Sequence, residues 1–236
     1  MPSILIIAVF TGVYTIAGGL RAVVWTEMLQ ICVLIIGMIT LSVATINAAG
    51  GVPALMATSK DWKIFLPAND PDFPWTQYLG GTLCISIFYC ATNQFIVQRT
   101  LAAKNEWHAR MGVIFSQFLK FLTPILIIAP ALVSVKLFPN LEKPDLLFVE
   151  LVEHLLPSGL VGLVMAALVS AVMSHISGAL NSSTTILTMD IYLPYIRRNA
   201  TEAQSVRFGR WAGIVIILLG IMSSVLLISY SDKPVF

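Results

Sequence analysis

Lys120 lies in the middle of a long apolar stretch of this 236-residue sequence, predicted to span about 109–137. It lies some ten residues into that stretch, which places its ammonium group about 15 Å deep if the stretch is a helix. A charged group near the bilayer midplane is costly, and it normally faces a polar cavity or partner on a transport pathway. The alternative is a side chain that snorkels to the interface, which requires the membrane span to begin nearer Phe115. We favour the transport pathway.

A second group of polar residues stands in the apolar stretch at about 75–99, where Tyr89 is followed by Asn93 and Gln94. A tyrosine ring can stack on a sugar or another apolar surface while its hydroxyl forms hydrogen bonds. The two amides could contact a solute or could equally hold neighbouring helices together. The pattern therefore indicates a polar site within the membrane without identifying its ligand.

Oxygen-bearing residues that could serve a cation occur in two further places. Residues 170–185 are dense in small and hydroxylated side chains. Close helix packing is the first explanation for such a stretch, but its hydroxyl and carbonyl oxygens could also bind a hard cation such as sodium. Glu27 is either an interfacial charge or part of a cation exit path, and the sequence leaves both possibilities open.

Enzymatic and nucleic-acid-binding functions find little support. The three histidines, His108, His154 and His175, are scattered without a zinc-type spacing. The three cysteines all fall in apolar stretches and are typical of small buried side chains. The formal charge is only +2, with no basic patch interleaved with aromatic residues, so no nucleic acid is expected as a partner.

The elements that must position these residues are membrane spans. Only 11% of the residues are charged and 57% are hydrophobic, whereas soluble domains have about 25% charged residues. Roughly 20 apolar residues cross a bilayer, and they must be helical to satisfy their backbone. We therefore predict an all-α integral membrane protein, multi-pass in the cell membrane, with the lipid bilayer as a partner. Its single transmembrane region, 1–236, has about six spans, at about 3–18, 22–48, 75–99, 109–137, 157–189 and 205–230.

Local signals divide and orient these spans. Gly18 and Gly19 predict a turn after the first span, and Pro124 and Pro130 predict kinks in the fourth. Positive residues are enriched on the cytoplasmic side of membrane proteins. One set of alternate loops carries eight of them, namely Arg21, Arg99, Lys104, Arg110, Arg197, Arg198, Arg207 and Arg210. The other set carries Lys60, Lys63, Lys136 and Lys143, so we assign the first set to the cytoplasm.

Three segments, at 18–27, 93–105 and 180–192, closely resemble the sugar branch of the solute:sodium symporters, the sodium/glucose cotransporter type. The resemblance runs in order along essentially the whole chain. It implies a partial inverted-repeat, LeuT-type transporter bundle that holds its substrate at the midplane. The chain resembles about core helices four to nine of that bundle, so we expect it to be a portion of a longer protein.

The resemblance also implies roles for individual residues. Tyr89 matches the gate tyrosine that stacks under the bound sugar, Lys120 matches a sugar-contacting lysine, and Ser86 falls at a polar sugar contact. Cys90 stands where a tryptophan is common, which bears on the sugar preference.

The same resemblance assigns the carbonyl of Ala171 and the hydroxyl of Ser174 to a sodium site. His175 replaces the second hydroxyl of that site, so it either alters sodium binding or turns away to pack. Glu27 stands where an aspartate is usual on the cation pathway.

We therefore expect sodium-coupled sugar symport by alternating access, with sodium as the coupled ion, no organic cofactor and no enzymatic chemistry. The alternatives are a sodium-coupled symporter of a non-sugar organic solute, because Cys90 departs from the sugar pattern, and a solute sensor on the same fold.

Overall fold

The computed structural model describes residues 2–58, 65–71, 74–134, 137–139 and 146–230, and the regular elements within these ranges are helices. In chain order they are α1 (Pro2–Ala48), α2 (Val52–Thr58), η2 (Tyr78–Thr82), α3 (Leu83–Ile87), η3 (Phe88–Thr92), α4 (Gln94–Leu101), α5 (Glu106–Thr123), η4 (Pro124–Ile128), α6 (Ala129–Ser134), α7 (Leu147–Leu155), α8 (Ser158–Ile186), η6 (Leu187–Ile196) and α9 (Glu202–Tyr230). Elements marked η are π-helical. The predicted all-α class is confirmed.

Five helical stretches in the described residues are long and apolar enough to cross a membrane: Ser3–Ala48, Tyr78–Leu101, Glu106–Ser134, Ser158–Ile196 and Glu202–Leu227. The first is 46 residues long and contains two of the six predicted spans. They are separated at Gly19, whose φ of 58° and ψ of −157° are not helical. A positive φ is accessible to glycine at little cost, so the predicted turn at this position is confirmed as a kink in α1.

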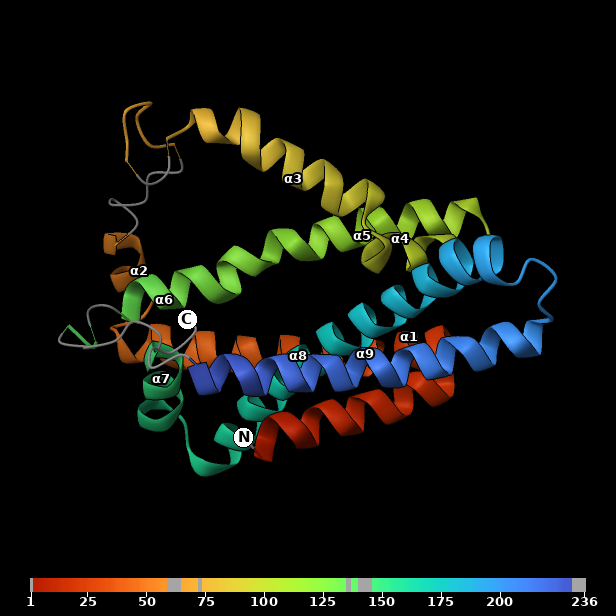
Figure 1. Ribbon diagram of the computed structural model, residues 1–236. Helices are drawn as coiled ribbons and strands as arrows, with labels where there is room; N and C mark the ends of the chain where they lie inside the picture. The colour runs from red at the N-terminus through yellow and green to blue at the C-terminus, as the bar shows by residue number, and fades with distance from the viewer. Residues whose placement is uncertain (1, 59–64, 72–73, 135–136, 140–145, 231–236) are drawn as a thin grey trace. The chain divides into compact units, whose positions relative to one another are not determined.

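The chain forms two compact units. Unit 1 comprises residues 1–37 and 162–236, and it holds residues 2–37 of α1, most of α8, η6 and α9. We call residues 2–18, before the kink at Gly19, the first part of α1. The first part of α1 packs against α9 (Figure 1), and a Cβ atom on Gly213 would lie only 3.0 Å from Cγ1 of Ile16. Val23, Val164 and Ala167 are almost fully buried in this unit.

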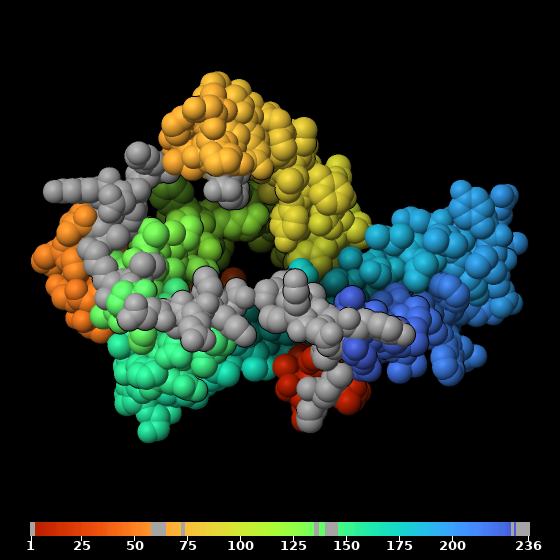
Figure 2. Space-filling view, turned by 60° about the vertical axis from the view of Figure 1, so that its left-hand side comes forward, coloured from red at the N-terminus to blue at the C-terminus, as the bar shows by residue number. Residues whose placement is uncertain are grey.

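Unit 2 comprises residues 38–161. Its two spans, 78–101 and 106–134, adjoin near the turn between α4 and α5 and diverge toward their other ends (Figures 1 and 2). A π-helical turn begins at Pro124, which has no N–H to donate, so the predicted interruption at this proline is confirmed. The Ser42 hydroxyl lies 2.5 Å from the Leu126 carbonyl oxygen of that turn. Such side-chain contacts satisfy irregular backbone inside a membrane.

Contacts within unit 1 agree with part of the predicted topology. Arg210 donates from Nη2 to the carbonyl oxygen of Ala17 over 3.4 Å, so the end of the first span and the start of α9 lie together. Both belong to the arginine-rich side predicted to be cytoplasmic. The lysines predicted for the opposite side, Lys60, Lys63, Lys136 and Lys143, lie outside the described residues.

Candidate functional site

Lys120 lies at the middle residue of the 29-residue span Glu106–Ser134. The helix that carries it, α5, begins at Glu106. A rise of 1.5 Å per residue puts Lys120 about 20 Å along the helix from either end. Lys120 therefore lies at the centre of this helical stretch, and its place on a transport pathway stays a prediction.

The structure brings Lys120 and Tyr89 together across two spans. The Lys120 Nζ lies 5.4 Å from the centroid of the Tyr89 ring, within the range of a cation–π interaction. The same nitrogen lies 3.9 Å from Sγ of Cys90. All three side chains are exposed within the described part of the chain. Tyr89 and Lys120 were predicted as substrate contacts, and their proximity was not assumed in that prediction.

Ser86, the third predicted sugar contact, lies on α3 and is exposed. It precedes Tyr89 by three residues, and residues at this spacing lie on the same side of a helix. The register therefore places its hydroxyl on the side of the span that carries Tyr89.

Two local features interrupt the span that carries Tyr89. The π-helical turn η3, Phe88–Thr92, contains Tyr89 and Cys90. The chain then becomes extended at Asn93, whose Oδ1 accepts a hydrogen bond from the backbone N–H of Phe95 over 3.0 Å and caps α4. Interrupted helices are a recurrent feature of transporter binding sites, and π-helical turns recur at functional sites.

Asn93 was expected either to contact a solute or to hold helices together, and the structure gives it the N-cap of α4. Asparagine is among the residues most favoured at that position. The capping signal was present in the sequence and could have predicted this role.

The sodium candidates Ala171, Ser174 and His175 all lie on α8. Ala171 and Ser174 are half-buried, and the Ser174 carbonyl oxygen accepts a hydrogen bond from Ser177 Oγ over 3.0 Å. Spacings of three and four residues place the three candidates on one side of the helix. Glu27, the cation-pathway candidate, is half-buried on α1. The sodium set stays a prediction.

His175 also lines a largely apolar cavity of about 350 Å³ within unit 1. The cavity lies between the first part of α1, α8 and α9, with Ile7, Ile217 and Ser183 among its walls. Isoleucine side chains offer no ligand to sodium. This position is compatible with the alternative in which His175 packs against neighbouring helices.

One polar feature was missed by the sequence analysis. Within the described residues, the side-chain oxygens of Thr11, Tyr14 and Thr15 on the first part of α1 are buried and have no hydrogen-bond partner. Buried hydroxyls normally have partners, so each such group requires an explanation. The spacing of Thr11 and Thr15, four residues apart in an apolar span, was the available signal.

Comparisons with known proteins agree on one family. The family model described as the sodium:solute symporter family matches residues 1–231. Human sodium/myo-inositol cotransporter 2 is 35% identical over 248 residues, which cover 90% of this chain and 37% of that protein. The sodium/glucose cotransporter of Vibrio parahaemolyticus is 33% identical, with 93% and 46% coverage. The sodium/mannose cotransporter of Bos taurus is 31% identical, with 93% and 42% coverage.

A solved structure of a sodium-coupled sialic acid symporter, in a substrate-bound outward-open state, has the same fold. Its TM-score is 0.86 at 22% sequence identity, and the match covers 97% of this chain and 51% of that one. The chain thus spans about half of this structure and less than half the length of the curated relatives above.

Proposed function

The chain belongs to the sodium:solute symporter family, and we propose that the protein containing it couples inward sodium movement to uptake of a sugar or cyclic polyol by alternating access. The family and the LeuT-type fold implied by the resemblance are thereby confirmed, as is the multi-pass membrane class. The curated relatives are cotransporters named for myo-inositol, glucose and mannose. These three solutes share a ring with several hydroxyl groups, which is the substrate class that we propose.

The observation that carries the proposal is the position of Lys120 beside Tyr89 in the middle of a membrane span. An ammonium group supplies three hydrogen-bond donors, which suit the hydroxyl oxygens of a sugar. The tyrosine face offers an apolar surface on which the carbon–hydrogen face of such a ring can stack. Ser86 can add a hydroxyl from the same span.

Sodium is the coupled ion in this proposal, bound by the Ala171 carbonyl and the Ser174 hydroxyl together with oxygen atoms from other parts of the protein. A hard cation prefers such ligands. One positive charge moving down a potential of 100 mV releases about 2.3 kcal/mol. That free energy can sustain a solute gradient of roughly fiftyfold for each sodium ion.

The proposal is tested with the purified protein that contains this chain, reconstituted in sealed vesicles. An inward sodium gradient should drive accumulation of labelled myo-inositol, glucose or mannose, and an equal potassium gradient should not. Unlabelled sugars should compete with the label, whereas a non-sugar solute such as proline should not.

The alternatives give different outcomes in the same experiment. Sodium-driven uptake of proline without sugar uptake would identify a symporter of non-sugar solutes. Sodium-dependent sugar binding without accumulation would identify a sensor. Either result would overturn the proposed function.

A further inference from the structure

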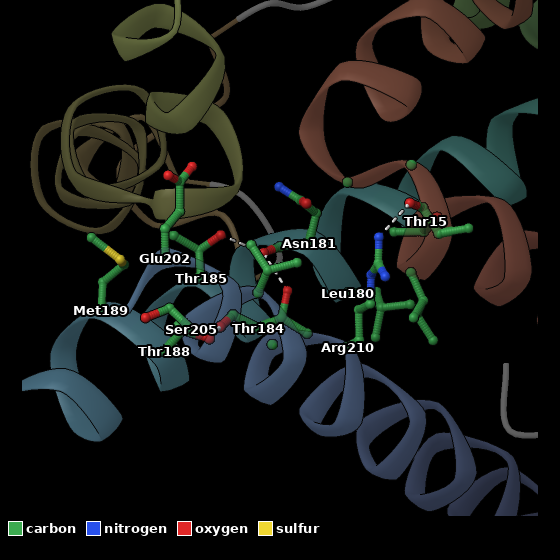
Figure 3. A pocket seen from close by; sticks show the side chains of 16 residues that line it. Thr15, Leu180, Asn181, Thr184, Thr185, Thr188, Met189, Glu202, Ser205 and Arg210 are labelled. Carbon is green, nitrogen blue, oxygen red and sulfur yellow. Dashed lines mark hydrogen bonds between the residues drawn. The ribbon is translucent and has the colours of Figure 1, made fainter. Parts of the chain in front are cut away.

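A second cavity in unit 1, which we call the end pocket, has a volume of about 440 Å³. It lies where the end of the first part of α1, the last turns of α8 with η6, and the first turns of α9 come together (Figure 3). Its polar lining includes Thr15, Asn181, Thr184, Thr188, Glu202 and Arg210. None of these residues belongs to the sugar or sodium sets described above.

The position of the end pocket along the spans indicates a membrane interface. Its wall includes Gly19, where α1 kinks between two spans, and the first turns of α9. Trp211, which follows a residue of the lining, has 63% of its surface exposed. Tryptophan is enriched at the level of lipid headgroups. The pocket is thus at the height at which a lipid headgroup lies, on the predicted cytoplasmic side.

Thr15 forms part of the wall of the pocket and is only 3% exposed. Its hydroxyl oxygen is itself buried, so Thr15 shapes the wall and does not offer this oxygen to a ligand.

The hydroxyl groups of two lining threonines, on α8 and η6, donate hydrogen bonds to backbone carbonyl groups. Thr184 donates its hydroxyl hydrogen to the Asn181 carbonyl over 2.9 Å, and Thr188 donates to the Thr184 carbonyl over 2.7 Å. Each oxygen keeps lone pairs that can accept a hydrogen bond. These two oxygens therefore suit a ligand that carries hydrogen-bond donors.

Two opposite charges on α9 complete the lining. Glu202 and Arg210 are eight residues apart, about 12 Å along the axis. They form no ion pair with each other in the described part of the chain. Arg210 uses one N–H on the Ala17 carbonyl, and a guanidinium has five N–H donors in all. The pocket thus presents a cationic and an anionic group that are not satisfied by one another.

We propose that the end pocket binds the headgroup of a zwitterionic phospholipid of the ethanolamine type. The phosphate would accept hydrogen bonds from Arg210, and the ammonium group would lie near Glu202 and the hydroxyl oxygens of Thr184 and Thr188. Arginine is well suited to phosphate. A headgroup with only a negative charge would leave Glu202 close to a phosphate without a compensating cation.

Native mass spectrometry of the delipidated protein in detergent tests this proposal. Phosphatidylethanolamine and phosphatidylglycerol with identical acyl chains are titrated separately. We expect at least tenfold tighter retention of phosphatidylethanolamine. Arg210→Gln should weaken that retention about tenfold, whereas Arg207→Gln, on the same helix but outside the pocket lining, should not.

A substitution of Glu202 tests whether its carboxylate recognises the ethanolamine ammonium group. Glu202→Gln should reduce or abolish the preference for phosphatidylethanolamine over phosphatidylglycerol, because the group that recognises the ammonium is lost. Thermal melting of each variant verifies folding. An unchanged lipid preference in Glu202→Gln, or equal losses in the Arg207 and Arg210 variants, would overturn the proposal.

Soluble competitors distinguish a lipid headgroup from free phosphate. Phosphoethanolamine should displace the bound lipid at concentrations where inorganic phosphate does not. Equal displacement by both compounds would show that the site recognises phosphate alone, and this would contradict the role of Glu202.

Discussion

The Lys120 ammonium lies 5.4 Å from the centroid of the Tyr89 ring, although the two residues come from different membrane spans. Lys120 and Tyr89 were predicted to contact a solute for two reasons. Both are polar residues deep in an apolar span, and both match sugar-contacting residues of the family that the sequence resembles. A cationic donor beside an aromatic face can recognise the hydroxyl groups and the ring of one molecule.

Tyr89 is expected to act through its ring. Tyr89→Phe retains stacking and the cation–π contact. The sugar concentration that gives half-maximal uptake should therefore change by no more than about threefold. Tyr89→Leu removes about 0.5–2 kcal/mol of ring interaction and should raise half-saturation roughly twofold to thirtyfold. Tyr78→Leu, on the same span but in contact with Phe65, is the matched control. Equal effects of Leu at positions 78 and 89 would exclude Tyr89 as a substrate contact.

Cys90 should report on occupancy of the same site, because its Sγ lies 3.9 Å from Lys120 Nζ. With sodium present and sugar at ten times half-saturation, alkylation of Cys90 should slow about tenfold, following the unoccupied fraction. Cys84, on α3, should react at an unchanged rate and serves as an internal control. Mass spectrometry of the labelled peptides measures both rates. Protection of neither cysteine would place the sugar elsewhere.

A substitution of His175 tests whether this residue replaces a sodium ligand or packs against neighbouring helices. Imidazole is a poor sodium ligand, so His175→Ser should restore a hydroxyl and lower half-saturating sodium about fivefold, the equivalent of roughly 1 kcal/mol. Ser183→Ala, in the wall of the same apolar cavity, should leave the sodium dependence unchanged. Superimposable sodium titrations for His175→Ser and the parent protein would identify His175 as a packing residue.

Two glycines of α9 should respond differently to alanine. A Cβ atom at Gly213 would lie 3.0 Å from Ile16 Cγ1 and 3.3 Å from Thr184 Cγ2. A Cβ atom at Gly220 would meet no packing neighbour within 4 Å among the described residues. Overpacking costs about 1–3 kcal/mol, and alanine otherwise favours a helix by up to about 1 kcal/mol. The melting temperature in detergent should therefore be lower for Gly213→Ala than for the parent protein or for Gly220→Ala. The reverse order would contradict the packing described for unit 1.

The sequence was sufficient to predict features that depend on one segment at a time. Apolar length predicted the spans, and the glycine pair at 18–19 predicted the kink in α1. Proline chemistry predicted the interruption at Pro124. Helical structure continues beyond the fifth predicted span, 157–189, as η6 through Pro194. The short helices α2 and α7 were missed because neither is long enough to cross a bilayer.

Contacts between segments could not be predicted in the same way. Hydropathy gives the depth of Lys120 but not the rotation of its helix, so the contacts with Tyr89 and Cys90 emerge only from the packed structure. The end pocket is a similar case, since Thr15 and Arg210 are far apart in the sequence but both line it where α1 and α9 pack. Family resemblance supplied roles for Ala171 and Ser174 as sodium ligands, and these roles stay predictions.

The most direct test of the proposed substrate site compares two lysines. Sodium-dependent binding of a labelled sugar is measured for the parent protein, Lys120→Ala and Lys104→Ala, the last being an exposed lysine in the turn between α4 and α5. Loss of a charged hydrogen bond costs about 1.5–3 kcal/mol, so Lys120→Ala should raise the dissociation constant roughly tenfold to over a hundredfold. Lys104→Ala should leave it unchanged. Equal sugar affinity in all three proteins would contradict a substrate site at Lys120 and Tyr89.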